Sequence, residues 1–319
     1  MNIKMEEMPP AVARYLSYKL SIQGASQATV YEYGIDLCVF LRYVFRKEIK
    51  ENETNLSNIS DEMIRTISSQ QIYDYLLYAA TVMKNQNASR ARKLSSIRGF
   101  FHFLCVKEKM METDPSQNID SPKVKHALPR FLSLDESRLL LKTVKDSVGE
   151  NSVRDFAIMT LFLNCGLRVS ELVGINCPDL TDDLTQMIVT GKGNKQRMIY
   201  LNESCRSALG RYLKERGSLY SKDETALFVS RNHRRLSVKT CQWLVYKYLK
   251  LAGLEQKNYS VHKLRHTAAT LMYETGKVDV RVLKDILGHE QLNTTQIYTH
   301  VSDEHMKQAM GENPLNDSE

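Results

Sequence analysis

The sequence predicts a mostly α-helical protein of two domains with one small antiparallel β-sheet. At 319 residues the chain is longer than one ordinary domain. Apolar residues recur at helical spacing through most of it, and the period shortens to that of strands only around residues 187–201. A break with three prolines, residues 112–129, is predicted to link an N-terminal domain, residues 1–111, to a C-terminal domain, residues 130–319.

Four or five helices are predicted in the N-terminal domain, and four of them can be located. The first follows Pro9 and Pro10, and the others cover residues 26–44, 70–82 and 89–106, where apolar side chains return every three or four positions. The polar stretch 50–60 is expected to be a loop. In the break that follows, the prolines remove backbone donors and disfavour helix just before themselves, so an extended linker is expected.

The C-terminal domain is predicted to begin with a capped helix. Ser133 and Glu136 form a capping-box pattern in the segment LSLDESRLLL. Further helices are expected at 151–164 and 168–173. Two short strands, 187–190 and 198–201, are expected to flank GKGNKQ as a hairpin with a basic, glycine-containing tip, and the rest of the chain is expected to be helical.

The composition is that of a globular protein with a basic excess that favours a polyanionic partner, although many ordinary enzymes carry as much. Hydrophobic residues make up 42% and charged residues 25%, which excludes disordered and fibrous classes. The net charge of +7 is a modest basic excess. No run reaches the ~18–20 apolar residues of a membrane span, the N-terminus does not match a signal peptide, and the six cysteines form no CxxC pair. We therefore expect a cytoplasmic protein without membrane insertion or a metal site.

Five short segments together describe one reaction class. They are GLRVSEL (166–172), GKGNKQR (191–197), HKLRH (262–266), LGH (287–289) and TTQIYTH (294–300). Each alone is weak, because an arginine at a helix start or a lysine between glycines is usually a surface or turn residue. Cleaving a phosphodiester without a metal requires cationic donors for the nonbridging oxygens, an acid for the leaving oxygen and a nucleophile. The five segments supply all of these groups.

In this order and spacing the five segments resemble the signatures of the tyrosine recombinases, and most nearly those of the Xer-type members. The resemblance implies a helical core-binding domain followed by an α/β catalytic domain. It also implies a site-specific recombinase that cleaves and rejoins DNA through a covalent 3′-phosphotyrosine, without metal, ATP or cofactor. Holliday junctions would be formed and resolved, as in chromosome or plasmid dimer resolution or in the integration and excision of mobile elements.

The resemblance assigns phosphate binding to three residues. Arg168 and Arg265 correspond to the two arginines that clamp the scissile phosphate, and His289 to a further donor to it. Arginine suits this task because its planar fork gives bidentate contacts to phosphate oxygens. Glu171, three residues after Arg168, is expected to share a helical face with it and to orient its neighbours.

The resemblance also assigns the proton transfers and the nucleophile. Lys192 corresponds to the general acid for the departing 5′ oxygen, His262 to a group that assists proton transfer, and Tyr298 to the nucleophile. A tyrosine with a pKa of ~10 is a poor nucleophile at neutral pH unless nearby cations favour the phenolate. The expected cluster of arginines, lysine and histidines would provide those cations.

Two basic stretches are assigned to DNA contacts beyond the active site. A solvated helix face is the ordinary interpretation of such stretches, but next to a phosphodiester-cleaving domain the DNA backbone becomes the better one. The residues assigned to DNA are Lys84, Arg90, Arg92, Lys93, Arg98, Arg234, Arg235 and Lys239.

The expected partners follow from the same resemblance. They are a double-stranded recombination site and further recombinase subunits, as a homo-tetramer or a hetero-tetramer with a related recombinase on two sites; an accessory protein is left open. Apolar-leaning positions between 301 and 310 suggest a terminal helix that docks into a neighbouring protomer, although packing on its own domain is the plainer interpretation.

Two other functions remain as alternatives. A type IB topoisomerase uses a similar residue set, but the Xer-like segments and the tail of 21 residues after Tyr298 argue against it. A catalytically silent DNA-binding protein of the same fold has no need for Tyr298 or Lys192.

Overall fold

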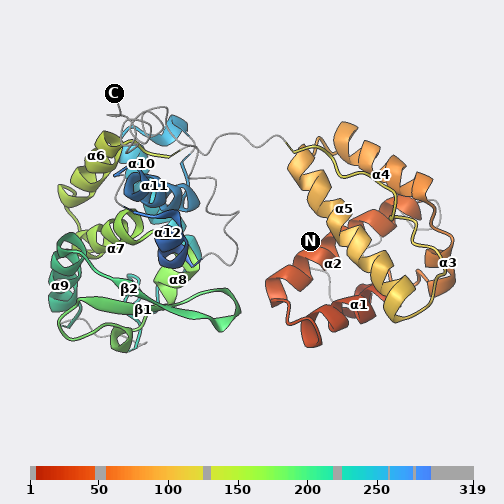
Figure 1. Cartoon of the computed structure of the whole chain (residues 1–319), viewed down its shortest axis with the longest axis horizontal. Helices are drawn as coiled ribbons and strands as arrows, with labels where there is room; N and C mark the ends of the chain where they lie inside the picture. The colour runs from red at the N-terminus through yellow and green to blue at the C-terminus, as the bar shows by residue number, and fades with distance from the viewer. Residues whose placement is uncertain are drawn as a thin grey trace, which may run out of the picture. The chain divides into compact units, whose positions relative to one another are not determined.

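The chain folds into two compact units, residues 1–126 and residues 127–319 (Figure 1). The computed structural model describes residues 5–46, 55–124, 131–217, 225–257, 259–275 and 278–288. Helices dominate both units, and the one sheet among these described residues has two strands. The predicted fold class is confirmed.

The first unit is all-helical. Its helices are α1 (Pro10–Ser21), α2 (Gln27–Val44), α3 (Asp61–Arg65), α4 (Ser69–Thr81) and α5 (Asn87–His102). The four located helices are present, and the short α3 is a fifth among the described residues, within the predicted four or five. The helix expected at 89–106 has a regular α-helical period only to His102, and a π-helical turn continues it to Lys107. Serine side chains cap α2, α3 and α4, which explains why these helices begin where they do.

The first unit has an aromatic core of its own. Tyr15, Phe40, Tyr75, Phe100 and Phe101 are fully buried. Phe40 meets Tyr75 edge-on at 5.2 Å between ring centroids, and Tyr15 meets Phe100 in the same way at 5.7 Å. Edge-to-face pairs add to the burial of apolar area that holds α1, α2, α4 and α5 together.

The first part of the predicted linker packs on this unit. Residues 112–124 contain no helix or strand, as expected, but Ile119 is buried in the aromatic core. Arg98 donates hydrogen bonds to the carbonyl oxygen of Ile119 and to Ser121 Oγ, and Ser69 Oγ donates to the carbonyl oxygen of Pro115 at 2.7 Å. The segment is therefore part of the first unit as far as residue 124, and residues 125–129 lie outside the described residues.

The second unit is built around one buried helix. Its elements are α6 (Leu134–Lys145), α7 (Ser152–Cys165), α8 (Val169–Gly174), β1 (Gln186–Thr190), β2 (Gln196–Tyr200), α9 (Glu203–Gly217), α10 (Val238–Leu251), α11 (Val261–Glu274) and α12 (Val280–Leu287). Helix α7 is buried along most of its length and packs against α6, α9 and α11 (Figure 1). The predicted capping box is present. Ser133 Oγ accepts a hydrogen bond from the backbone N–H of Glu136, and the Glu136 carboxylate accepts one from the backbone N–H of Ser133.

The two strands form the predicted antiparallel hairpin. Gln186 pairs with Tyr200 and Thr190 with Gln196. Lys192–Asn194 makes a single 3-10 turn at the tip, where Gly193 has a φ of 72° that favours glycine. The prediction of a glycine-containing basic tip is therefore confirmed.

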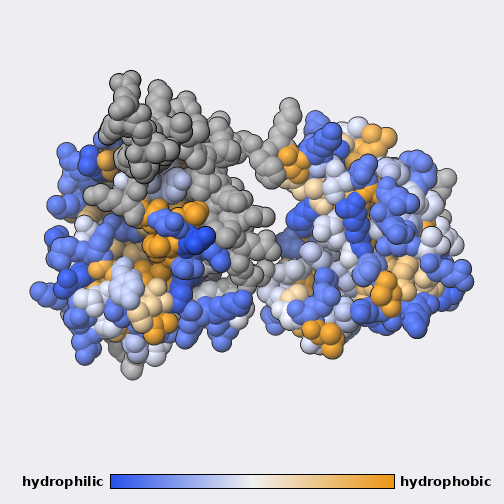
Figure 2. Space-filling view, viewed as in Figure 1, coloured by the Kyte–Doolittle hydropathy of each residue, from blue (hydrophilic) through white to orange (hydrophobic). Residues whose placement is uncertain are grey.

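The face of the first unit seen in Figure 2 is mainly polar. Figure 2 shows hydrophilic residues over most of the viewed face of the first unit, with hydrophobic residues in small separate patches. Within the described ranges, no helix has both the length and the apolar character that a bilayer span requires. The same residues contain no group of three or more His, Cys, Asp or Glu side chains arranged to hold a metal ion.

Candidate active site

A tight link between α7 and α8 places Arg168. Helix α7 ends at Cys165, and Gly166 follows in the left-handed conformation with φ 62°. A side chain at Gly166 would lie 2.9 Å from Leu287 Cδ2, so this turn also requires glycine for space. Arg168 is then the N-cap of α8, in extended conformation. The local sequence GLR therefore ends one helix and begins the next at the predicted arginine.

Glu171 is a buried carboxylate that two arginines share. Its side chain is 1% exposed. Glu171 accepts hydrogen bonds from the backbone N–H of Arg168 at 2.8 Å and from Arg168 Nη1 at 2.6 Å. Arg197 Nη1 and Nη2 donate hydrogen bonds to its two carboxylate oxygens at 2.8 and 2.9 Å. Burial by itself raises the pKa of Glu171, but the hydrogen bonds from Arg197 and Arg168 outweigh it, so the pKa lies below its usual value.

Arg265 reaches the same place from α11. It is 1% exposed, and its Nη1 donates to the carbonyl oxygen of Gly166 at 2.7 Å while Nη2 donates to that of Leu287 at 2.6 Å. Its Nη1 also lies 3.9 Å from Glu171 Oε2. Arg265 therefore joins the turn after α7 to the end of α12 and completes a cluster with Glu171.

The end of α12 is held by three arginines. Arg197 Nε donates a hydrogen bond to the carbonyl oxygen of Ile286 at 2.9 Å, and Arg265 donates one to the carbonyl oxygen of Leu287. Arg168 Nη2 donates to the carbonyl oxygen of Gly288 at 3.2 Å. A helix C-terminus carries unsatisfied carbonyls and a partial negative charge, which cations stabilise. The backbone that leads into residue 289 is thereby fixed against the arginine cluster.

The cluster carries a surplus of positive charge. Arg168, Arg197 and Arg265 bring three guanidinium groups against the single carboxylate of Glu171. The side chain of Arg168 is 32% exposed, so the surplus charge reaches the surface there. Such a site attracts an anion and stabilises negative charge that develops on it.

His262 lies one turn before Arg265 on α11. Its ring is exposed, and the ring of His266 meets it edge-on at 4.7 Å between centroids. Desolvation, followed by the positive charges of Arg265 and Arg168, lowers the pKa of His262; desolvation and the neighbouring His262 lower that of His266 to about 4. The lowered pKa values favour the neutral form of both imidazoles, and a neutral His262 can accept a proton.

The predicted catalytic residues are brought together as far as the described residues extend. Arg168, Glu171 and Arg265 share one hydrogen-bonded cluster. Lys192 is placed by its backbone, in the hairpin turn next to Gly191; a Cβ on Gly191 would lie 3.3 Å from Glu171 Oε1. His289 and Tyr298 lie outside the described residues. Arg168 precedes α8 as its N-cap, so it does not share a helical face with Glu171, and Glu171 instead accepts hydrogen bonds from both the backbone N–H and the guanidinium of Arg168.

The basic stretch on α5 corrects one predicted DNA contact. Lys93 is 7% exposed and its ammonium lies 3.3 Å from the buried carboxylate of Asp36 on α2, so it forms a core ion pair instead of the predicted surface contact. Arg92 forms a fork with the same carboxylate, at 2.5 and 2.9 Å, but keeps part of its side chain exposed. Arg90 is half-buried beside Asn87, and Lys84 is exposed.

Two further predicted contacts have structural partners. Arg98 binds the segment after α5, as described above. Arg235 donates to the carbonyl oxygens of Val173, Gly174 and Ile175 at 3.1 to 3.3 Å and so supports the end of α8. Arg234 and Lys239 are exposed. The exposed cations Lys84, Arg92, Arg234 and Lys239 are thus the ones that remain accessible to a polyanion.

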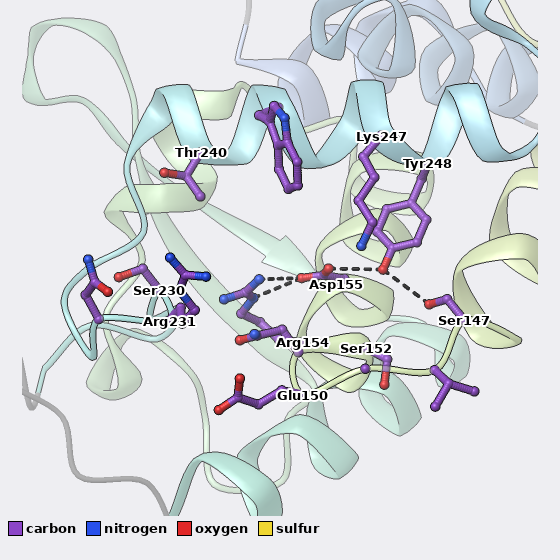
Figure 3. Close-up of a pocket in the computed structure, with 15 residues that line it drawn as sticks. Ser147, Glu150, Ser152, Arg154, Asp155, Ser230, Arg231, Thr240, Lys247 and Tyr248 are labelled. Atoms are coloured by element: carbon purple, nitrogen blue, oxygen red, sulfur yellow. Dashed lines mark hydrogen bonds and ion pairs between the residues drawn. The ribbon is translucent and has the colours of Figure 1, made fainter.

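A cavity in the second unit lies away from this cluster. It has a volume of about 530 Å³ and opens between the loop before α7, the loop before α10 and α10 itself (Figure 3). An ion pair between Arg154 and Asp155 forms its floor. The Asp155 carboxylate also accepts a hydrogen bond from the Tyr248 hydroxyl at 3.1 Å. None of the predicted catalytic residues that the structure describes lines it. Since the polar groups of its floor are paired with one another, the cavity does not compete with the arginine cluster as the candidate site.

Arg197 is the member of the cluster that sequence reasoning did not assign. It is the last residue of GKGNKQR, the segment that drew attention for Lys192. Its side chain is 14% exposed and contacts Glu171 and the end of α12. No signal near Arg197 indicates this role, because the predicted strand begins only at residue 198, whereas β2 begins at Gln196.

Comparisons with known proteins find matches to both units of the chain. Residues 130–305 match the model of the phage integrase family, and residues 12–108 match its N-terminal SAM-like domain. A tyrosine recombinase XerC from Caldanaerobacter subterraneus is 44% identical over 313 residues, which cover 96% of this chain and 87% of the relative.

Two solved structures share the fold. One is the XerH site-specific recombinase bound to difH substrate, with a TM-score of 0.71 at 20% identity, covering 98% of this chain and 97% of the other. The second is a lambda integrase tetramer bound to a Holliday junction, with a TM-score of 0.63 at 18% identity, covering 88% and 76%. At such identities the likeness is one of fold.

Proposed function

This chain belongs to the phage integrase family and is a site-specific tyrosine recombinase of the Xer type, and from that premise we propose how its residues divide the reaction. Arg168 and Arg265 bind the nonbridging oxygens of the scissile phosphate. The hydroxyl oxygen of Tyr298 attacks the phosphorus, a 3′-phosphotyrosine bond forms, and the bond to the 5′ oxygen breaks. Lys192 gives its proton to that oxygen. A 5′ hydroxyl of the partner strand then reverses these steps, which rejoins the DNA.

The arginine cluster is the observation that supports this proposal. Arg168 and Arg265 are fixed by backbone carbonyls and by Glu171, so they do not have to reorganise when charge develops on the phosphate. Their surplus positive charge favours the phenolate of an approaching tyrosine. A neutral His262 beside them is suited to take the proton that the tyrosine loses. His289, directly after the end of α12, would add a donor to the phosphate.

A nicked suicide substrate tests the nucleophile. The wild-type protein should accumulate a protease-sensitive protein–DNA adduct, and Tyr298→Phe should form none while still binding the site. Arg168→Ala and Arg265→Ala should each lower the cleavage rate by about 10²–10³-fold with a smaller loss of binding, because their contacts strengthen in the transition state. An adduct of undiminished yield from Tyr298→Phe would contradict the assignment.

The same assay separates the alternative functions. A type IB topoisomerase would relax supercoiled plasmid without a specific site, and a silent DNA-binding protein would bind without any adduct. A site-specific recombinase should form adducts on its own recombination site and exchange strands only when two such sites are present.

The proposal extends to partners. Double-stranded DNA is the substrate, and the exposed cations Lys84, Arg92, Arg234 and Lys239 contact its backbone. Assembly is a tetramer on two sites, either of this chain alone or with a related recombinase. Support comes from the lambda integrase tetramer on a Holliday junction, which has this fold. Truncation after His300 should abolish strand exchange and leave single-site binding intact if the terminal segment docks into a neighbour.

The biological role proposed is dimer resolution of a chromosome or plasmid, with integration or excision of a mobile element as the second candidate. The named relatives of Xer type favour the first. The site of action is the cytoplasm, where DNA is available and where six unpaired cysteines are kept reduced. Sequencing the genomic sites trapped as covalent adducts would identify the role.

A further inference from the structure

Arg197 ties the hairpin that carries Lys192 to α8 and to the end of α12. Its backbone belongs to β2 of the hairpin. Its Nη1 and Nη2 hold both oxygens of Glu171 on α8, at 2.8 and 2.9 Å, and its Nε donates to the carbonyl oxygen of Ile286 on α12 at 2.9 Å. One planar side chain thus fixes the hairpin to the helix that Arg168 caps and to the helix end that precedes residue 289.

The hairpin turn that carries Lys192 lies directly against this tie. A Cβ on Gly191, the residue before Lys192, would be 3.3 Å from Glu171 Oε1 and 3.8 Å from Arg197 Nη1. The backbone N–H of Gly191 donates to the carbonyl oxygen of Lys195 at 2.8 Å and so closes the turn at its base. The backbone next to Lys192 therefore runs so close to the paired carboxylate and guanidinium that a methyl group at Gly191 would touch both.

We propose that Arg197 is a positioning residue that sets the place of Lys192 relative to the scissile phosphate, which is bound at Arg168 and Arg265. This inference rests on the proposed role of Lys192 as the general acid. A flexible hairpin by itself leaves a long lysine side chain with many positions for its ammonium. Anchoring the turn to Glu171 and to α12 gives the backbone of Lys192 a fixed place in the same frame that holds the phosphate-binding arginines.

Lysine at position 197 is the informative substitution. Lysine keeps the positive charge beside Glu171, so the buried carboxylate retains a counter-ion. It cannot make the two-oxygen fork and at the same time reach the carbonyl of Ile286, because its ammonium is a single point donor on a flexible stem. Arg197→Lys therefore removes the tie and leaves the charge.

The test is single-turnover cleavage of two suicide substrates, one with the normal 5′ oxygen and one with sulfur in its place. A sulfur leaving group needs little protonation, so it rescues the loss of a general acid, which is worth about 10²–10⁴-fold. Arg197→Lys should be about 100-fold slower than wild type on the oxygen substrate, the effect of misplacing a catalytic group by about 1 Å. On the sulfur substrate it should come within about 10-fold of wild type.

Two further variants serve as the benchmark and the control for Arg197→Lys. Lys192→Ala is the benchmark and should show the same slowing and the same rescue. Arg216→Lys is the matched control: Arg216 also anchors backbone in this unit, donating to the carbonyl oxygens of Ala226 and Leu227, and it should be unimpaired on both substrates. DNA binding and the thermal unfolding midpoint of each variant are measured alongside, so that a folding defect is seen as such.

The outcomes separate this inference from the proposed function. Rescue of Lys192→Ala but not of Arg197→Lys would overturn the positioning role and leave the acid assignment intact. Equal rates for Arg197→Lys and wild type on the oxygen substrate would also overturn it. Failure of sulfur to rescue Lys192→Ala would remove the acid assignment itself, and the inference with it.

Discussion

A methyl group at Gly288 should press directly on Arg197. Gly288 has a φ of 64°, and a Cβ built there lies 3.0 Å from Arg197 Nη1, 3.1 Å from Cδ and 3.2 Å from Cζ. Alanine in the left-handed region costs about 1 kcal/mol by itself. Crowding a side chain that hydrogen bonds already hold adds about 1–3 kcal/mol. We expect Gly288→Ala to lower the free energy of unfolding of the second unit by about 2–4 kcal/mol.

Gly253→Ala is the matched control for this prediction. Gly253 is also left-handed, with φ 70°, but nothing lies within 4 Å of the position of its Cβ. It should therefore incur the conformational cost of about 1 kcal/mol and no crowding. The difference between the two variants, about 2 kcal/mol, corresponds to about 4–8 °C in melting temperature for a unit of this size.

Urea unfolding followed by tryptophan fluorescence measures the difference. Trp243 is the single tryptophan of the chain and lies on α10, so its signal reports the second unit without the first. In an Arg197→Ala background the extra cost of Gly288→Ala should disappear, which a double-mutant cycle detects. Equal destabilisation by Gly288→Ala and Gly253→Ala would refute the reasoning.

The remaining predictions concern the two buried carboxylates and the segment after α5. Glu171→Gln should destabilise the second unit by about 3 kcal/mol at pH 7. Folding lowers the pKa of Glu171, so the stability that its charged form contributes is fully present above the unfolded-state pKa of about 4.3 and is lost as the pH falls below it. The difference in free energy of unfolding between wild type and variant should therefore be smaller at pH 3.5 than at pH 7 in urea unfolding curves. Asp36→Asn, which breaks the fork with Arg92, should lower the stability of the first unit by about 2–4 kcal/mol in far-UV circular dichroism melts; an unchanged melt would contradict the buried pair. Ile119→Ala should cost the first unit about 2–4 kcal/mol, whereas Val124→Ala, at a more exposed position, should cost under about 0.5 kcal/mol.

Local signals made most of the fold predictable. Ser133 and Glu136 are three residues apart, and the capping box that joins them is confirmed. The hairpin was predictable for the same reason, since the strand period and the glycines of its tip lie within fifteen residues. Interactions of this range depend on neighbours in the chain and can be recognised from a short window.

Contacts between distant residues were not predictable in this way. Lys93 was assigned to DNA because it lies in a basic stretch, but its partner Asp36 is 57 residues away and nothing near Lys93 indicates it. Arg197 was not assigned because Glu171 lies 26 residues earlier, on a helix rather than in the hairpin. The roles of Arg168 and Arg265 were accessible only through their joint resemblance to a family, since each arginine alone is compatible with a surface position.

The packing of residues 112–124 has a consequence for folding during synthesis. Domains fold as units, the N-terminal one first, while the ribosome is still extending the chain. The aromatic core of the first unit lacks Ile119 until that residue has emerged, and Arg98 lacks its acceptor until then. Emergence of this short irregular segment therefore completes the first unit. Arg168 and Arg265 are translated only afterwards, so a nascent chain holds a finished helical unit before it has any means of cutting DNA.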